Sequence, residues 1–294
     1  MMRVVQPAMP FPRLWAGGPS VVYEGEALDV LCRMPPSVAR CCVTSPPYWG
    51  LRDYGVEGQL GAEHRLADYI DRLVQIMRQV RRVLAADGTL WLNIGDCYTS
   101  GGRTWRAPDK KNPARAMDYR APTPRGLKPK DLVGVPWRVA LALQDDGWYL
   151  RSDIVWHKPN ALPESVKDRP TQAHEYIFLF SKSEKYFYDY EAAREPGANG
   201  RPRNRRTVWS VPTEAYSEAH FATYPPSLIE PCVMAGSSEG DTVIDPFFGS
   251  GTTGLVAAEN GRNFVGVELV SEYVDMARRR LAERGIFFDV FRRT

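Results

Sequence analysis

A glycine-rich turn in the last quarter of the sequence constrains the fold more than any other feature. The apolar run TVID (242–245) leads into PFFGSGTTG, where Gly249, Gly251 and Gly254 match the pattern GxGxxG, and a second apolar run ends at Glu268. A strand, a glycine turn, a helix and a second strand in this order normally open a doubly wound sheet that continues into further strands. Only 40 residues follow Gly254. We therefore expect the sheet to be completed by strands from earlier in the chain, in a circularly permuted order.

The earlier part of the chain alternates short apolar runs with helical patterns, as an α/β fold does. The runs are VVYE (21–24), CCVT (41–44), TLWLNI (89–94), WYLRSDIVW (148–156) and EYIFLFS (175–181). Apolar residues recur at spacings of three and four over residues 66–84, which predicts a helix with Gly88 as its end. EYIFLFS is expected to turn through SKSEK into YFYDY as a β-hairpin. Together these patterns predict one α/β domain over residues 1–294.

Composition limits the class of protein. Hydrophobic residues make up 44% and charged residues 25% of the chain, and no apolar run reaches the roughly 18 residues of a membrane span. Pro7, Pro10 and Pro12 interrupt the apolar N-terminal stretch, so no signal peptide is predicted. The five cysteines show no CxxC spacing, which predicts neither a disulfide framework nor a metal site. We expect a cytoplasmic protein with reduced thiols and no membrane partner.

Two segments concentrate positive charge although the net charge is only +3. Residues 101–131 hold nine Lys or Arg against three Asp and show no periodicity, which predicts a long basic loop. RPRNRR (201–206) adds four arginines inside the irregular stretch 191–219. Either run alone could be a solvated loop. Together, interleaved with aromatic residues, they favour contact with a phosphate backbone.

The glycine turn has the chemistry of a cofactor site. Glycines let backbone N–H groups approach a ligand at a helix N-terminus, and a carboxylate such as Glu268 at the end of the second strand can accept hydrogen bonds from both hydroxyls of a ribose. Asp245, Pro246 and Phe247 before the glycines suit adenosyl and methionyl groups better than a pyrophosphate, because nothing basic is expected near the turn. A purely structural turn is the alternative.

A second motif follows the strand at 41–44, where Ser45, Pro46, Pro47 and Tyr48 end it abruptly. With TSPPY early in the chain and DPFFGSG late, the sequence resembles the β-group of amino-DNA methyltransferases. Four further segments are similar to that family's and come in its order: IVWHKPN (154–160), HEYIFLFSKS (174–183), HFATYPPSLIEP (220–231) and GVELVSEYV (266–274). The resemblance implies a Rossmann-like class I methyltransferase fold, with a seven-stranded, mostly parallel sheet and one antiparallel strand. It also implies S-adenosyl-L-methionine as cofactor and methylation of the exocyclic amine of a base in double-stranded DNA.

The resemblance also assigns site residues. Ser45, Pro46, Pro47 and Tyr48 would be catalytic. The side-chain oxygen at position 45 and the Pro46 carbonyl would accept the two N–H bonds of the amine, and the Tyr48 ring would stack on a base flipped out of the duplex. The cofactor would be held by Asp245, Pro246, Phe247, Gly249, Ser250, Gly251, Thr252, Thr253, Glu268, His220, Phe221 and Glu26. Asp29 is the alternative to Glu26. Residues expected to contact DNA are Lys110, Lys111, Arg115, Lys158, Arg203, Arg205 and Arg206, with a short recognition insertion at about 191–219.

The SPPY form of the motif favours cytosine N4 as the target, and adenine N6 is the alternative. Two other classes stay open on sequence alone: a nicotinamide oxidoreductase using the GxGxxG turn, and a DNA-binding module without activity. Pro231-Cys232 is similar to a nucleophile motif of C5-cytosine enzymes, but its predicted place in a helix marks Cys232 as structural. We expect a restriction–modification setting without a stable complex with the endonuclease, and the sequence leaves open whether the protein is a homodimer.

Overall fold

The computed structural model describes residues 20–56, 58–100, 105, 121–197, 200–214 and 223–292. The strands are β1 (Val21–Glu24), β2 (Ala39–Thr44), β3 (Leu84–Ile94), β4 (Tyr149–His157), β5 (His174–Ser181), β6 (Glu195–Pro196), β7 (Pro202–Arg203), β8 (Val208–Ser210), β9 (Thr242–Asp245), β10 (Asn263–Glu268) and β11 (Asp289–Phe291). The helices are α1 (Ala27–Arg33), α2 (Leu66–Val83), α3 (Val135–Asp145), α4 (Pro226–Gly236), α5 (Thr252–Glu259) and α6 (Ser271–Ala282).

Nine strands form one sheet in the order β11-β1-β10-β9-β2-β3-β5-β4-β8. β5 runs antiparallel to its neighbours β3 and β4, whereas the remaining adjacent pairs are parallel. The seven expected strands with one antiparallel member are therefore confirmed. The short strands β11 and β8 extend the sheet at its two edges.

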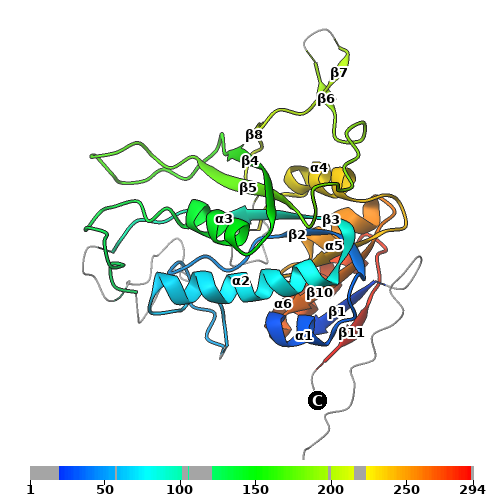
Figure 1. The fold of residues 1–294 in the computed structure, drawn as a ribbon, viewed down its shortest axis with the longest axis horizontal. Helices are drawn as coiled ribbons and strands as arrows, with labels where there is room; N and C mark the ends of the chain where they lie inside the picture. The colour runs from blue at the N-terminus through cyan, green and yellow to red at the C-terminus, as the bar shows by residue number, and fades with distance from the viewer. Residues whose placement is uncertain are drawn as a thin grey trace, which may run out of the picture.

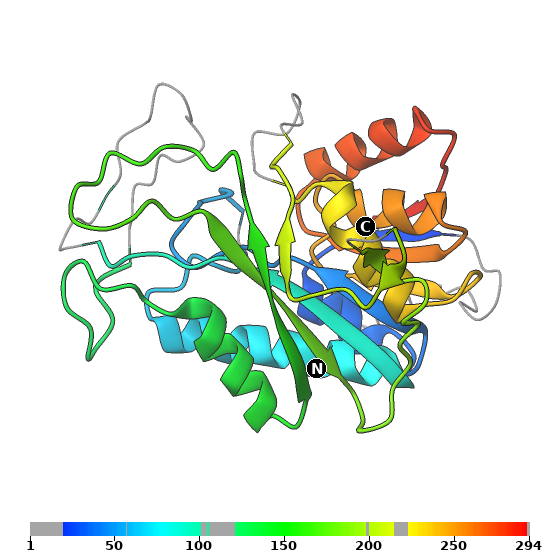
Figure 2. The same cartoon turned by 90° about the horizontal axis from the view of Figure 1, so that it is seen from above.

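Helices cover both faces of the sheet (Figures 1 and 2). α1, α2 and α3 pack on one face, and α4, α5 and α6 pack on the other, and each set encloses its own hydrophobic cluster. This three-layer arrangement is that of a doubly wound α/β domain. The helices cover the faces of the sheet but not the ends of its parallel strands, and loops from several strands meet at those ends.

The predicted amphipathic helix is confirmed as α2. Its buried residues are Leu66, Tyr69, Leu73, Ile76, Met77, Val80 and Val83, all on the predicted stripe. The prediction that Gly88 ends this helix is wrong, because the chain passes directly into β3 at Leu84. Gly88 lies inside β3, where an added Cβ would lie 2.8 Å from the Arg40 carbonyl oxygen. The glycine is explained by the close approach of β2.

The permuted order is confirmed in the middle of the sheet. β9, from the C-terminal part of the chain, lies between β10 and β2, with Val243 in register with Cys41 and Ile244 with Cys42. The ends of β9 and β2 are also joined through their side chains, because Thr44 Oγ1 donates a hydrogen bond of 2.6 Å to Asp245 Oδ1. The SPPY motif and the glycine turn, distant in sequence, therefore begin at adjacent strand ends.

The predicted hairpin from β5 into YFYDY is wrong. Both edges of β5 are already paired, with β3 on one side and β4 on the other. Residues 186–190 form no strand: Phe187 N donates to the Asp87 carbonyl oxygen at 2.9 Å, and Asp189 N donates to the Ala235 carbonyl oxygen of α4 at 2.9 Å. The antiparallel neighbour of β5 is therefore β4, which precedes β5 in the chain, and not the segment YFYDY that follows it.

The stretch 191–219 carries the two short strands β6 and β7, which pair with each other and project from the body of the molecule (Figure 1). β8 follows and returns to the edge of the main sheet beside β4. Among the described helices, none has the length and apolar content needed to cross a membrane.

Candidate active site

Asp245 organises the junction between β9 and β2. Its side chain is only 2% exposed, and four donors surround the carboxylate: Thr44 Oγ1 and Phe247 N on Oδ1, and Thr253 Oγ1 and Tyr224 Oη on Oδ2. Burial raises the pKa of Asp245 above its usual range, and the hydrogen bonds from Thr253 and Thr44 act in the opposite direction. Both oxygens are thus used inside the protein. Asp245 holds the glycine turn and the end of β2 together.

The glycine turn is shaped by close packing around Phe248. An added Cβ on Gly254 would lie 2.7 Å from the Phe248 ring, and one on Gly266 of β10 would lie 2.5 Å from it. Gly251, with φ of 80°, precedes α5 and allows the sharp entry into that helix. The third glycine of the pattern therefore serves helix–sheet packing. Gly251 also allows the close approach of α6, because a Cβ there would lie 3.0 Å from Leu281 Cδ1.

Glu268 bridges the two turns that follow β9 and β10. Its carboxylate accepts a hydrogen bond of 2.7 Å from Gly249 N and one of 2.9 Å from Val270 N. The residue is 9% exposed, and burial raises its pKa from 4.5 to about 7, opposed by the backbone N–H donors of Val270 and Gly249. A largely buried carboxylate beside backbone N–H groups is an acceptor suited to sugar hydroxyls.

Ser250 and Thr252 are buried at the start of α5 and contact an arginine that is distant from them in the sequence. Arg280 of α6 donates to Ser250 Oγ at 3.0 Å and to Thr252 Oγ1 at 2.8 Å. The prediction that nothing basic is near the turn is therefore wrong, because the fold brings Arg280 into contact with it. The guanidinium is held by the turn's own oxygens, which ties α6 to α5.

This set of groups fits an adenosyl cofactor. A carboxylate stands at the end of β10 beside a glycine turn and a helix N-terminus, as ribose recognition in this fold requires. Glu26, at the end of the neighbouring strand β1, accepts from Asp29 N at 2.8 Å and lies 3.4 Å from Arg72. Its carboxylate caps α1 in this structure. Pro246 is buried and Phe247 is partly buried against the core of the α1–α3 face.

The SPPY motif leaves the end of β2 as a fixed turn. Tyr69 of α2 donates to the Pro47 carbonyl at 3.0 Å, which pins the second proline. Ser45 Oγ donates to Tyr48 Oη at 3.2 Å, so that the first and last residues of the motif are linked. Pro46 is buried between them. All four predicted catalytic residues thus form one compact unit directly after Thr44.

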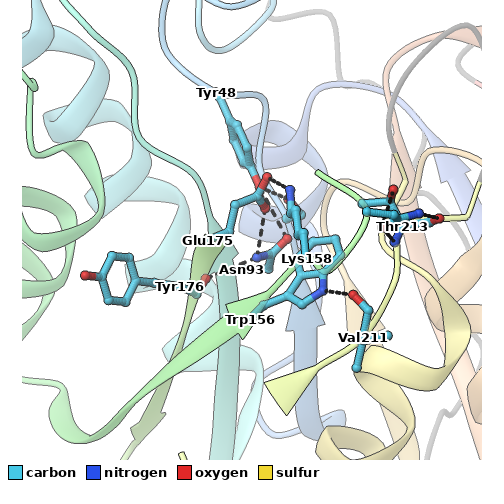
Figure 3. A network of polar contacts seen from close by, with 10 residues as sticks. Tyr48, Asn93, Trp156, Lys158, Glu175, Tyr176, Val211 and Thr213 are labelled. Atoms are coloured by element: carbon cyan, nitrogen blue, oxygen red, sulfur yellow. Dashed lines mark hydrogen bonds and ion pairs between the residues drawn. The ribbon is translucent and has the colours of Figure 1, made fainter. Parts of the chain in front are cut away.

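Tyr48 enters a polar network that sequence reasoning missed (Figure 3). Its hydroxyl lies 2.8 Å from Glu175 Oε2 of β5 and 3.2 Å from Asn93 Oδ1 of β3. Lys158 forms an ion pair with the other oxygen of Glu175, and both side chains are under 20% exposed. Burial first, and the Glu175 charge second, raise the pKa of Tyr48 well above its usual 10. Lys158, predicted to contact DNA, is in this structure part of the network around Tyr48.

Glu175 and Asn93 could have been suspected from one signal only. Each is a polar residue in an otherwise apolar strand, HEYIFLFS or TLWLNI. Their partnership with Tyr48 depends on the pairing of β5 with β3, in which Asn93 faces Ile177. That antiparallel pairing has no local pattern in the sequence.

The arginines of the second basic segment are partly paired within the protein. Arg203 and Arg206 share Glu195, at 2.9 and 3.0 Å, while Arg205 donates to the Ala193 carbonyl and lies over the Trp209 ring. Arg206 remains 70% exposed. His220, Phe221, Lys110, Lys111 and Arg115 lie outside the described residues.

Cys232 lies in α4 with no exposed surface, and burial raises the pKa of its thiol well above the usual 9. This environment suits a structural cysteine. Groups of three or more residues able to hold a metal ion do not occur within the described ranges.

Comparison with known proteins gives consistent matches. A family model described as DNA methylase, of the N6/N4 type, matches residues 39–279. The type II methyltransferase M.XycI of Xanthomonas campestris pv. cyanopsidis is 64% identical over 89% of this chain and 87% of its own. Another, M.SmaI of Serratia marcescens, is 59% identical over 90% of this chain and 91% of its own.

Solved structures agree on the fold. A DNA modification methylase from Thermus thermophilus, complexed with S-adenosyl-L-methionine, is 26% identical with a TM-score of 0.64 and matches 94% of this chain and all of its own. The PvuII cytosine-N4-specific DNA methyltransferase is 22% identical, with a TM-score of 0.66 over 90% of this chain and 87% of its own. At that identity the second match concerns the fold alone.

Proposed function

The chain belongs to the DNA methylase family of N6- and N4-methyltransferases, and on that premise we propose that it methylates the exocyclic N4 amine of cytosine at specific sites in duplex DNA. S-adenosylmethionine is the methyl donor. Membership in this family makes the oxidoreductase interpretation wrong.

One contact supports the proposal most. Thr44 Oγ1 donates to Asp245 Oδ1 at 2.6 Å, so the SPPY turn and the glycine turn leave the sheet side by side. A base entering beside Ser45 would then meet a cofactor held at Gly249 and Glu268. Such proximity of amine and methyl donor is the main requirement of a direct transfer.

The residues of the SPPY turn provide hydrogen-bond acceptors that make the exocyclic amine a better nucleophile. Its lone pair is delocalised into the ring, and acceptors on both N–H bonds draw the nitrogen toward a tetrahedral shape. We assign one acceptor to Ser45 Oγ and the other to the Pro46 carbonyl, since the Pro47 carbonyl is occupied by Tyr69. When bound, S-adenosylmethionine supplies an electrophilic methyl group. Tyr48 offers its ring to the flipped base, whose unstacking costs a few kcal/mol.

The choice of cytosine rests on residue 45. SPPY is the form usual among N4-cytosine enzymes, as the resemblance implies. A serine hydroxyl is a neutral acceptor that must donate its own proton elsewhere, and Ser45 has such a partner in Tyr48 Oη at 3.2 Å. This arrangement is consistent with an uncharged acceptor for the amine at position 45.

Binding of duplex DNA is assigned to the basic loop 101–131 and to the insertion 191–219, which carries the β6–β7 hairpin. We propose that these belong to one methyltransferase domain. The names of the relatives are those of type II methyltransferases. We infer that an endonuclease of the same specificity accompanies this enzyme without a stable complex.

The product decides the proposal. The protein is expressed in a bacterial host without DNA methylation, and the host DNA is digested to nucleosides and analysed by mass spectrometry. N4-methylcytosine is expected from the wild type and a strongly reduced amount from Ser45→Ala. N6-methyladenine as the sole product would overturn the assignment of the base. Sequencing with detection of modified bases would then give the recognition site.

A further inference from the structure

Ser45 is the first member of a chain of side chains drawn from four parts of the fold. Ser45 Oγ lies 3.2 Å from Tyr48 Oη, which lies 2.8 Å from Glu175 Oε2, and Lys158 pairs with Glu175 Oε1. Figure 3 shows the Tyr48 hydroxyl, Asn93 and Lys158 gathered around the Glu175 carboxylate. The chain runs from the end of β2 across β3 and β5 to the residue that follows β4.

The hydrogen bonds in this chain can run in only one direction. Asn93 Nδ2 donates to the Tyr176 carbonyl at 3.1 Å and to Glu175 Oε2 at 3.2 Å, which turns Asn93 Oδ1 toward Tyr48. Tyr48 Oη therefore faces two acceptors, Asn93 Oδ1 and Glu175 Oε2, and its single proton goes to one of them.

With its proton committed there, Tyr48 can only accept from Ser45. The serine hydroxyl must then donate its proton to Tyr48 Oη, and its lone pairs are left for another donor. The raised pKa of Tyr48 keeps its proton in place at neutral pH. A serine that points its proton away from the site presents the same face to an incoming amine as a carbonyl does.

We propose that Glu175 is a positioning residue that fixes the hydrogen-bond direction through Tyr48 and so makes Ser45 an acceptor for the target amine. Lys158 holds Glu175 in place, and its ammonium group lies 4.2 Å from the centre of the Trp156 ring. Gly95 leaves room for the arrangement, because a Cβ there would lie 2.8 Å from Tyr48 Cε2. The inference rests on the proposed role of Ser45 and not on which base is methylated.

The test uses Glu175→Gln, which keeps the shape of the side chain. An amide in place of the carboxylate can donate to Tyr48 Oη and removes the nearer and charged of its two acceptors. Only the longer contact to Asn93 Oδ1 at 3.2 Å then competes with Ser45 for the tyrosine proton. We expect the single-turnover rate of methyl transfer to fall about tenfold or more, as for a loss of orientation, with the Kd for S-adenosylmethionine unchanged. The readout is tritium transferred from the labelled cofactor to DNA, which counts N4 and N6 products alike.

Double variants separate positioning from a structural role. Tyr48→Phe keeps the ring and removes the hydroxyl, so Glu175→Gln should cause no further loss in that background, nor in Ser45→Ala. Losses that multiply would show that Glu175 acts independently of Ser45 and would overturn the inference, as would a wild-type rate for Glu175→Gln. Asp146→Asn, in an ion pair with Arg78 between α2 and α3, is the matched control and should keep the wild-type rate.

Two outcomes keep the inference apart from the proposed function. A wild-type rate for Ser45→Ala would remove Ser45 from the reaction and refute the inference, while the product formed by the wild type still decides the proposed function. A slow Ser45→Ala with a fast Glu175→Gln would refute the inference alone. If Glu175→Gln does not fold, Glu175→Asp, which draws the carboxylate back from Tyr48, replaces it in the same backgrounds and is decided by the same outcomes.

Discussion

The Gly249 amide and the Glu268 carboxylate, 19 residues apart, are joined by a hydrogen bond of 2.7 Å. This bond ties the turn after β9 to the turn after β10 across the ends of two neighbouring strands. The carboxylate therefore stands at the edge of the glycine turn before any ligand arrives, already oriented by Gly249 and by Val270. Pre-orientation of this kind lowers the entropy cost of binding.

Removal of the Glu268 carboxylate should weaken cofactor binding. We expect Glu268→Ala to raise the Kd for S-adenosylmethionine about tenfold or more, because a hydrogen bond to a charged group contributes about 1.5–3 kcal/mol. Isothermal titration calorimetry measures the change. Glu272→Gln, an exposed position in the first turn of α6, is the control and should bind normally. Normal affinity in folded Glu268→Ala would exclude this residue from the site.

Cofactor affinity should depend on pH through the same group. The pKa of Glu268 is raised to about 7 by burial, and the ionised form is the better acceptor for ribose hydroxyls. Affinity should therefore fall as pH drops through 7, by up to about tenfold per unit. Titrations between pH 6 and 8 test this, and Glu268→Gln should flatten the profile. A flat profile in the wild type would contradict the assignment.

The same shift has the opposite effect on the free protein. Since the folded pKa lies above the ordinary value of 4.5, the folded state binds the extra proton between these two values. The stability contribution of Glu268 should be fully present below pH 4.5 and be lost as pH rises through about 7. Thermal unfolding without cofactor, compared between wild type and Glu268→Gln, isolates this term.

Loss of a donor to Asp245 should destabilise the junction of β9 and β2. Thr253→Val removes a hydrogen bond of 2.6 Å to a fully buried carboxylate, at a cost of about 1–3 kcal/mol. We expect a lower Tm and a lower midpoint in urea unfolding. The exposed Thr207→Val serves as control. An unchanged Tm would mean that Tyr224 and Thr44 suffice to satisfy the carboxylate.

Gly95→Ala should affect catalysis more than folding. The new Cβ would lie 2.8 Å from Tyr48 Cε2 and 3.2 Å from Glu175 Cγ, and would displace the ring. A displacement of this kind can lower kcat about a hundredfold, while cofactor affinity stays normal. Gly266→Ala offers the contrast, because its Cβ would meet Phe248 at 2.5 Å and should lower the Tm instead. Equal kcat in Gly95→Ala would show that Tyr48 tolerates the shift.

Salt dependence of DNA binding should report on the arginine segment. Arg203, Arg205 and Arg206 carry three positive charges, and Glu195 offsets one of them. Neutralising the three arginines should therefore flatten the slope of log affinity against log salt by about two units, rather than three. When Glu195→Gln is added to the three arginine substitutions, the slope should stay close to that of the variant with the three arginine substitutions alone. An identical slope before and after neutralisation would mark the segment as a solvated surface.

Periodicity and glycine spacing were enough to predict much of the fold. The stripe on α2 follows from apolar residues at the helical repeat, and the succession of β9, α5 and β10 follows from the glycine spacing and the apolar runs on either side of it. The hairpin after β5 was wrong because a strand's partner depends on which edge is free. β4 had already taken the edge that YFYDY would have needed.

The residues of the candidate site also divide into those that lie in local motifs and those that only the assembled fold brings together. Ser45, Tyr48, Gly249 and Glu268 belong to local motifs that can be located in the sequence, and their roles in the site stay predictions. Glu175 and Asn93 reach Tyr48 from sequence distances of 127 and 45 residues. Arg280 meets Ser250 from a distance of 30 residues. Such contacts arise only when the sheet and its helices are assembled, and no local pattern records them.

The junction of β2 with β9 also governs how the chain can be made. Thr44 and Asp245 are 201 residues apart, so β2 leaves the ribosome long before its neighbour exists. Until then the edge of β2 lacks a partner, and exposed strand edges are templates for aggregation. A translation product that stops before β9 would have this open edge and no glycine turn. Such a product could not cover the edge, so the order of the strands delays closure of the sheet until β9 has been synthesised.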